Sequence, residues 1–314
     1  MLEGFAAAIA AAGVWAVSSA VIAHQARRID PFSISFLRAT WAGIFLIAAV
    51  FAFGAEDDFG RMSTGDVAQL IGAGFLSTAV AETLYAFTIP LFGFTRTYTI
   101  TTATSVLFAF IFGALFIGDT VTVLVGVGSV VVLAGVYMVA IYGRPRELAI
   151  VPGLTQADKP RISPPGLLLR HAFVAGLLLA IVTGVTWGGV SVWLRSATEG
   201  FDATAAGVVR MPVVLPVLAL LAGLQPRSSI RQRTIGWRSF AWLALSGVIG
   251  TGLVILLIIT ALQHIGAGEF TVLFNTGPLF GILLGAVFLR ERATPWAIVG
   301  ALVVLAGIGM IAAR

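Results

Sequence analysis

Long apolar runs separated by short polar segments follow one another along almost the whole chain. Ten of them have about the 20 residues with which a helix crosses roughly 30 Å of hydrocarbon. They contain glycines throughout and show no period-two alternation, which favours helices over a membrane β-barrel. We therefore predict an all-α membrane protein with ten transmembrane helices, at 4–24, 31–54, 67–91, 97–117, 120–142, 171–194, 203–224, 238–263, 268–289 and 294–313.

A repeat at a spacing of 172 residues relates the two halves of this pattern. The run Val-Val-Leu-Ala-Gly at 131–135 recurs at 303–307. The same spacing relates residues that apolar bias alone would not align, namely Trp15 and Trp187, Asp30 and Asp202, Arg38 and Arg210, and Asp119 and Glu291. The pattern indicates a duplicated chain, which is typical of secondary transporters.

The duplication also predicts how the halves are arranged. Ten helices divide into five and five, and an odd number of crossings places the second copy upside down in the membrane. We predict two inverted five-helix repeats, residues 1–142 and 171–314, joined by a polar linker at 143–170. The substrate sites of such proteins lie where the repeats meet.

Composition agrees with a chain that lies in lipid. Hydrophobic residues make up 59% of the sequence and charged residues 11%, and the mean hydropathy is +1.02. The net charge of +5 comes from loops beside predicted membrane helices, so lipid headgroups and topology explain it better than nucleic acid. With no cysteine, disulfides and thiolate metal sites are excluded.

The basic residues divide unevenly between the two sets of predicted loops. Arg61, Arg195 and Arg314 flank one face. The other face is flanked by Arg27, Arg28, Arg96, Arg144, Arg146, Lys159, Arg161, Arg170, Arg227, Arg231, Arg233, Arg238, Arg290 and Arg292. By the positive-inside rule the richer face is cytoplasmic, which puts both termini outside.

Three charged residues, Arg38, Glu82 and Arg210, fall well inside predicted helices, where a charge costs at least roughly 2.5 kcal/mol and usually marks function or a structural pair. Arg38 and Glu82 lie at matching depths, about 10 and 13 Å from the same membrane edge, so they form a candidate pair for structure, gating or coupling. Arg210 has no such mate, because the position of Glu82 in the second repeat is Val254. Arg210 is therefore a candidate cation for a substrate anion, unless Glu269, Asp119 or a helix carbonyl neutralises it.

The fourth predicted helix is rich in hydroxyls. Thr97, Thr101, Thr104 and Ser105 fall on one helical face. They either bond to carbonyls of their own helix or form the polar wall of a cavity. In the ninth helix Asn275 stands near Pro278, which removes a backbone donor and frees a carbonyl. We predict that Thr101, Thr104 and Asn275 contact the substrate.

Aromatic residues complete the candidate site. Trp15 and Trp187 stand in the middle of their predicted helices, away from the interface belts where tryptophan is enriched. Tyr85 is three residues past Glu82, on the same helical face. These three side chains either pack in the core or line the pocket and stack on an organic substrate.

Several classes of chemistry have no support in the sequence. A phosphate-binding loop with lysine is absent, so ATP-driven pumping is not indicated. His24, His171 and His264 lie at helix edges without metal-ligand spacing, so we predict no metal, no cofactor and no enzymatic activity. The first helix contains no acid inside the membrane, which leaves Glu82 as the candidate for proton coupling.

These features together resemble the EamA branch of the drug/metabolite transporter superfamily. The resemblance rests on the duplication, a Trp in the first helix of each repeat (Trp15, Trp187), an Arg early in the second (Arg38, Arg210), and an acid before the last helix (Asp119, Glu291). It implies a multi-pass transporter that moves small polar or amphipathic metabolites, frequently amino acids, outward across the bacterial inner membrane.

Our interpretation is a secondary transporter in which the two repeats enclose a central cavity that is exposed alternately to the two faces. Its partners would be a small-molecule substrate, membrane lipid and, as the candidate coupling ion, protons. Two alternatives remain open: a lipid or polyprenyl-phosphate flippase, with Arg210 as the phosphate contact, and an intramembrane enzyme.

Overall fold

The computed structural model describes residues 2–117, 123–142, 166–198, 200–265, 270, 273–274 and 294–312, and these contain helices and connecting turns and no strand. The helices of the first half are α1 (Leu2–Gln25), α2 (Pro31–Phe53), α3 (Asp58–Arg61), α4 (Thr64–Gly74), η1 (Phe75–Glu82), α5 (Thr83–Phe92), α6 (Phe94–Phe112), η2 (Gly113–Ile117) and α7 (Val123–Tyr142). Those of the second half are α8 (Gly166–Ala197), α9 (Ala203–Val209), α10 (Met211–Leu224), α11 (Trp237–Gly247), η4 (Val248–Leu253), α12 (Val254–His264) and α15 (Pro295–Ala312).

Within the described part of the chain, seven helical stretches are long and apolar enough to cross a membrane. They match the first four and the sixth to eighth predicted spans, at Leu2–Gln25, Pro31–Phe53, Thr64–Phe92, Phe94–Phe116, Ala172–Arg195, Ala203–Leu224 and Trp237–His264. Helices α7 and α15 stand at the fifth and tenth predicted spans and carry shorter apolar stretches. The ninth span (268–289) and the linker (143–170) lie largely outside the described residues, so the total of ten stays a prediction.

The repeated aspartates begin equivalent helices. The Asp30 carboxylate accepts the backbone N–H of Ser33 at 2.9 Å, and Asp202 accepts that of Thr204 at 2.8 Å. Each caps the first turn of its helix, α2 or α9, and satisfies a donor that has no partner within the helix. The spacing that relates Asp30 to Asp202 therefore reflects a shared N-cap.

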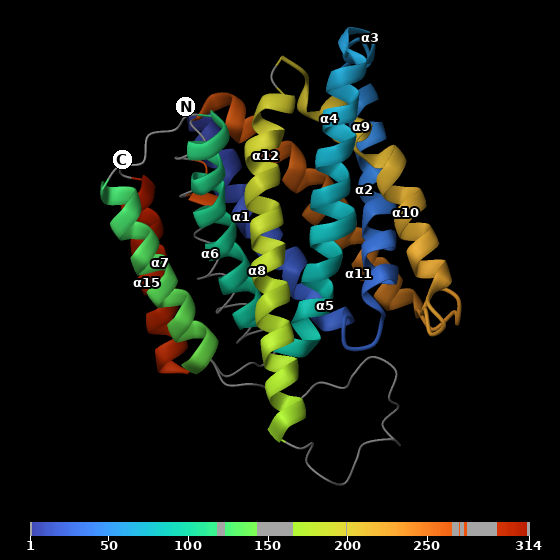
Figure 1. Ribbon diagram of the computed structural model, residues 1–314. Coiled ribbons are helices and arrows are strands. Elements are labelled where there is room, and N and C mark those ends of the chain that lie inside the picture. The colour runs from blue at the N-terminus through green and yellow to red at the C-terminus, as the bar shows by residue number, and fades with distance from the viewer. Residues whose placement is uncertain are drawn as a thin grey trace.

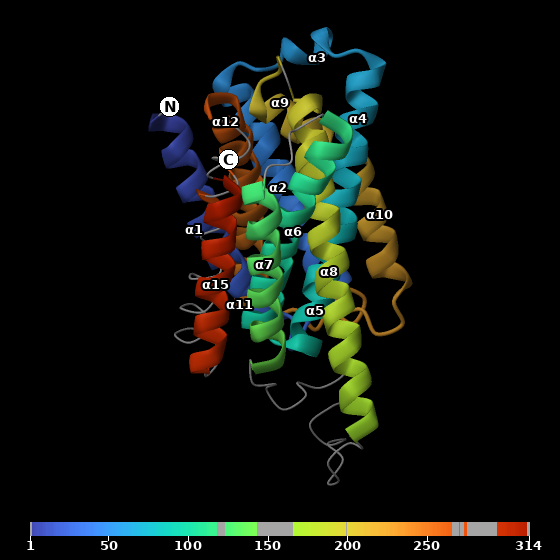
Figure 2. The ribbon, with the colours of Figure 1, turned by 60° about the vertical axis from the view of Figure 1, so that its left-hand side comes forward.

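The first helices of the two halves run in opposite directions. In Figure 1, α1 begins at the top beside the N-terminus and descends, whereas α8 begins at the bottom and rises. The second helices are also opposed, because α2 rises to α3 at the top and α9–α10 descends (Figure 1). Figure 2 shows α3 above the bundle, between α2 and α4.

Wide π-helical turns interrupt the two longest membrane-spanning stretches. The turn η1 lies in Thr64–Phe92, and the turn η4 lies in Trp237–His264. Their starting residues, Phe75 and Val248, are separated by 173 positions and not by 172. The structural counterpart of Glu82 is thus Ile255 and not Val254, a correction of one residue. Both residues are apolar, so the second repeat still has no acid at this place.

The last helix of each half packs against its counterpart. Helices α7 and α15 lie side by side in both ribbon views (Figures 1 and 2). A Cβ added to Gly135 would stand 2.7 Å from the Gly300 carbonyl, and one added to Gly307 would stand 2.7 Å from the Val132 nitrogen. Only glycine permits this approach, which explains why the glycines at the ends of the repeated 131–135 and 303–307 runs are kept.

Candidate functional site

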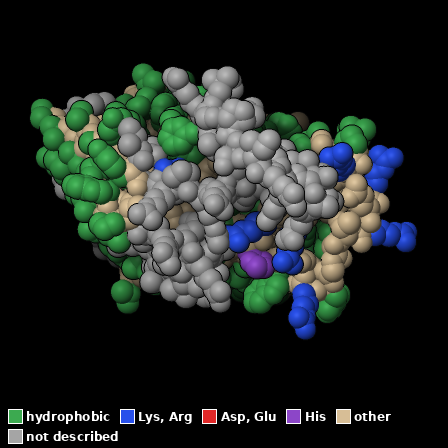
Figure 3. Space-filling model, turned by 90° about the horizontal axis from the view of Figure 1, so that it is seen from below, with side chains coloured by type: hydrophobic (Ala, Val, Ile, Leu, Met, Phe, Trp, Pro, Cys, Tyr) green, Lys and Arg blue, Asp and Glu red, His purple; other side chains and the backbone are tan. Residues whose placement is uncertain are grey.

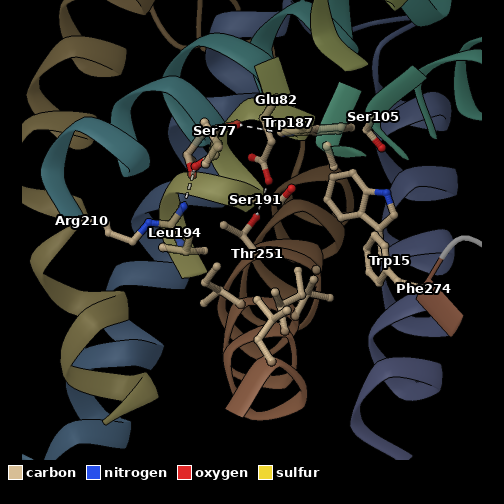
Figure 4. Close-up of a pocket in the computed structure, with 18 of the residues that line it drawn as sticks. Trp15, Ser77, Glu82, Ser105, Trp187, Ser191, Leu194, Arg210, Thr251 and Phe274 are labelled. Atoms are coloured by element: carbon tan, nitrogen blue, oxygen red, sulfur yellow. Dashed lines mark hydrogen bonds between the residues drawn. The ribbon is translucent and has the colours of Figure 1, made fainter. Parts of the chain in front are cut away.

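A cavity of about 170 Å³ lies between the two halves. Described residues from α1, η1, α6, α8, α10, η4 and α12 line it, together with Phe270 and Phe274 (Figure 4). Its polar side chains are Arg210, Glu82, Ser77, Thr78, Ser105, Ser191 and Thr251. The remaining wall is mostly apolar, formed by Trp15, Val106, Ala109, Trp187, Val190, Leu194, Met211, Val254, Ile255, Ile258, Leu262, Phe270 and Phe274.

The predicted pair of Arg38 and Glu82 is present. Arg38 Nη1 lies 3.1 Å from Glu82 Oε2, and the two residues are 1% and 5% exposed. The other two guanidinium nitrogens donate to Ser246 Oγ at 2.8 Å and Ser18 Oγ at 3.0 Å. Glu82 Oε1 accepts the Thr251 hydroxyl at 3.1 Å. Each charged group is therefore paired and hydrogen-bonded, which a buried ion pair requires.

This charge network joins the two halves of the chain. Ser18, Arg38 and Glu82 belong to the first half, and Ser246 and Thr251 belong to the second. Glu82 also borders the cavity, whereas Arg38 stands behind it. A change at Glu82 would thus reach both the cavity and the contact between the halves.

Arg210 lines the cavity and has a different environment. Its Nη2 donates to Ser77 Oγ at 2.5 Å, and its Nε has no hydrogen-bond partner among the described residues (Figure 4). The residue is 3% exposed, and no acidic side chain in the described ranges forms a salt bridge with it. Glu269 and Asp119, the acids considered as partners, lie outside those ranges.

The chain positions Arg210 at a break between two helices. Helix α9 ends at Val209 and α10 begins at Met211, with Pro212 in its first turn. Because proline has no N–H to donate, Pro212 removes a backbone hydrogen bond that a continuous helix would make at this break. Arg38, its repeat mate, lies within the uninterrupted helix α2.

A glycine of the opposite half lies against each arginine. A Cβ added to Gly74, just before η1, would stand 2.5 Å from the Cβ of Arg210. Gly247, just before η4, meets the backbone of Arg38 in the same way. The missing side chains let the helices approach closely, which brings each arginine to the π-helical turn of the other half.

The three predicted aromatic residues form one cluster. The Trp15 and Trp187 rings meet edge to face with centroids 5.2 Å apart, and Tyr85 lies 5.9 and 5.5 Å from them. Trp15 and Trp187 border the cavity, whereas Tyr85 is buried and is not part of the described lining. Trp187 Nε1 donates to the Ser77 carbonyl at 3.1 Å, which fixes the indole against η1 (Figure 4).

The predicted threonine wall lies elsewhere. Thr101 donates to the Ala180 carbonyl of α8 at 3.3 Å, and Thr104 contacts Gly184 of the same helix. Glycines on α8 let it pack directly on this face of α6, so Thr101 and Thr104 are not in the described lining of the cavity. Ser105 is the member of the face that borders it, and Asn275 is outside the described residues.

Six hydroxyl residues that the sequence did not single out belong to the site: Ser18, Ser77, Thr78, Ser191, Ser246 and Thr251. Single serines and threonines are common in membrane helices, where they usually bond to their own backbone. A signal was available, because a shift to 173 aligns Gly74 with Gly247 and Thr78 with Thr251. That shift identifies the two π-helical turns as equivalent.

Comparison with known proteins gives two further observations on fold and relatives. A protein of Streptantibioticus cattleyicolor, described as a "Probable terminal-alkyne amino-acid exporter", is 32% identical over 132 residues, which are 42% of this chain and 43% of that protein. The match thus spans less than half of that relative. A solved crystal structure, described only as that of a protein, matches 99% of this chain and 96% of its own with a TM-score of 0.68 and 17% identity, which shows a shared fold.

The profile of the EamA-like transporter family matches twice, at residues 2–141 and 174–313, one copy in each half of the chain. Together these matches cover most of the sequence. They agree with the resemblance drawn from the repeated Trp and Arg positions, and with the apolar helices of the fold. The chain belongs to the EamA-like transporter family.

Proposed function

We propose that this protein exports α-amino acids with uncharged, mainly apolar side chains by alternating access, and that Arg210 binds the substrate carboxylate. In this proposal ten helices form two inverted five-helix repeats (1–142 and 171–314), and the repeats rock against each other around the cavity. The proposed location is the bacterial inner membrane. The similarity to a protein described as a probable amino-acid exporter supports the choice of substrate.

The observation that carries the proposal is the state of Arg210. A guanidinium that is 3% exposed, with an Nε lacking a partner among the described residues, is costly to keep without a compensating anion. It lies in the wall of a cavity large enough for a small organic molecule, since about 150 Å³ suffices for benzene. A carboxylate would complete its hydrogen bonds in the bidentate geometry that arginine favours.

The other walls suit the rest of an amino acid. Ser105 donates its hydroxyl hydrogen to the Thr102 carbonyl at 2.8 Å, and Ser191 donates to Gly188 at 2.8 Å. With their single hydrogens engaged, these oxygens offer acceptors to an ammonium group. The apolar side chains of α8 and α12 would then surround the substrate side chain.

Counterflow in proteoliposomes tests this function. Vesicles preloaded with unlabelled L-leucine are expected to accumulate labelled L-leucine, and an amino acid with a terminal alkyne should compete. L-Leucinamide, which has the same side chain and no carboxylate, should compete poorly. Movement of a fluorescent phospholipid without amino-acid counterflow would instead support a flippase.

We also propose Glu82 as the proton carrier, because its carboxylate borders the cavity while it holds Arg38 and Thr251. Protonation would weaken both contacts and so loosen the connection between the halves. Leucine counterflow per amount of folded protein should then persist in a Glu82→Gln variant, because the amide oxygen can still accept a hydrogen bond from Arg38, whereas uptake driven by an imposed proton gradient should be lost. Gradient-driven uptake by this variant at the parent rate would exclude Glu82 as the carrier.

We predict that both termini face the periplasm. The face formed by the loops after α1 and α10 carries exposed arginines at 27, 28, 227, 231, 233 and 238, and Figure 3 shows basic side chains gathered there. A reporter enzyme that works only in the periplasm should be active when it is fused after Arg314. A reporter that works only in the cytoplasm should be active when it is inserted at Pro160. Cytoplasmic activity at both sites would reject this orientation.

A further inference from the structure

Ser77 connects the two kinds of wall in the cavity. Its hydroxyl oxygen accepts Arg210 Nη2 at 2.5 Å, and its carbonyl accepts Trp187 Nε1 at 3.1 Å. It lies in η1, a π-helical turn, which is a structure found frequently at functional sites. One residue thus fixes both the buried cation and the neighbouring aromatic ring (Figure 4).

The hydrogen of the Ser77 hydroxyl is already used. It points to the Ala73 carbonyl at 2.8 Å, with Gly74 O at 3.3 Å. The oxygen can therefore act towards Arg210 only as an acceptor, and it is neutral. It holds the guanidinium in place without cancelling its charge.

The second half treats the equivalent position differently. Counted from the starts of the two π-helical turns, the counterpart of Ser77 is Gly250. A Cβ at Gly250 would overlap the Ser18 hydroxyl, which reaches through this gap to Arg38. Arg38 forms a direct ion pair with Glu82, whereas the bond of Arg210 in the described part of the chain is to the Ser77 hydroxyl, and Glu82 acts on it electrostatically without a direct contact. The asymmetry separates a structural arginine from one whose charge remains available.

We propose that Ser77 is the positioning residue that makes the cavity select carboxylates: it orients Arg210 through a neutral acceptor and leaves the charge for the substrate. This inference rests on the proposed function, because the anion is taken to be the carboxylate of an amino acid. In this view two features produce the preference for an anion: the positive charge of Arg210, and a neutral side chain in place of an acid at position 77.

Ser77→Asp and Ser77→Asn form a matched pair, since the two side chains have nearly the same shape and differ in charge. Binding of L-leucine and of L-leucinamide to the purified protein is the measurement. The Asn variant should keep most of the preference for leucine. The Asp variant should bind leucine about 10- to 100-fold more weakly, the range expected when a charged hydrogen bond is lost, while its affinity for leucinamide is kept or raised. Ser77→Thr, which retains the hydroxyl, should restore most of the preference.

A merely structural role of Ser77 would change the affinities for leucine and leucinamide together. Equal ratios of the two affinities in the Asp and Asn variants would therefore overturn the inference. Thermal midpoints without ligand provide a second readout, because a new acid beside the buried Arg210 should raise the midpoint of the Asp variant above that of the Asn variant. If the parent protein binds no leucine, the proposed function fails, and the midpoints then test only the claim that Ser77 leaves the Arg210 charge available: a higher midpoint for Asp supports this claim and equal midpoints reject it.

Discussion

Replacing Arg210 by alanine is expected to leave a folded protein that no longer transports amino acids. The guanidinium is buried in the cavity wall, and its contacts in the described structure are to a neutral hydroxyl. Its removal leaves no opposite charge unpaired within that part of the chain, so the thermal midpoint should stay near that of the parent. Loss of the carboxylate contact should lower leucine affinity by at least about 10-fold.

The contrast between lysine and alanine at this position sharpens the test. Arg210→Lys keeps the positive charge and loses the planar two-pronged contact, so only partial activity is expected. Arg195→Ala is the matched control, because Arg195 is an exposed arginine at the end of α8. Leucine counterflow and Kd should be measured for all three. If the Arg210→Ala protein binds leucine as tightly as the Arg195→Ala protein, the substrate anion does not lie at Arg210.

The sequence was most informative at residues whose burial in a membrane has a high free-energy cost. Arg38 and Glu82 were paired by depth alone, and their side chains meet at 3.1 Å. Trp15 and Trp187 were linked by the repeat, and their rings contact each other in the wall of the cavity. Charged and large aromatic side chains inside membrane helices fit only a few environments, so their positions strongly restrict the fold.

Residues whose burial in a membrane has a low free-energy cost, such as threonine and serine, were harder to place. A threonine can satisfy its hydroxyl on its own helix wherever it faces, so the hydroxyl face of α6 did not reveal which neighbour would cover it. The side chains missing at Gly184 and Gly188 decided this, by letting α8 close over Thr101 and Thr104. Ser77 was overlooked for a related reason, because a π-helical turn changes the register within one helix and leaves no strong mark in the sequence.

The buried pair should be the most sensitive point of the fold. Arg38→Ala leaves Glu82 with the Thr251 hydroxyl as its remaining bonded partner, and Glu82→Ala leaves Arg38 with the two serines, Ser18 and Ser246. Each change strands a charge that water does not reach, at a cost of roughly 3–5 kcal/mol. Both single variants should show a large drop in thermal midpoint in detergent and in the yield of folded protein.

The double variant Arg38→Ala/Glu82→Ala separates the charge effect from the loss of packing. It leaves neither charge unpaired, so it should be more stable than either single variant, with a coupling that a double-mutant cycle measures directly. Ser246→Ala is the control, since it removes one hydrogen bond to Arg38 and should cost about 1 kcal/mol. Additive losses in the double variant would mean that the 3.1 Å contact contributes nothing to stability. A measured coupling would instead establish that the contact between Arg38 and Glu82, which has no counterpart around Ile255 among the described residues, stabilises the first half beside the cavity.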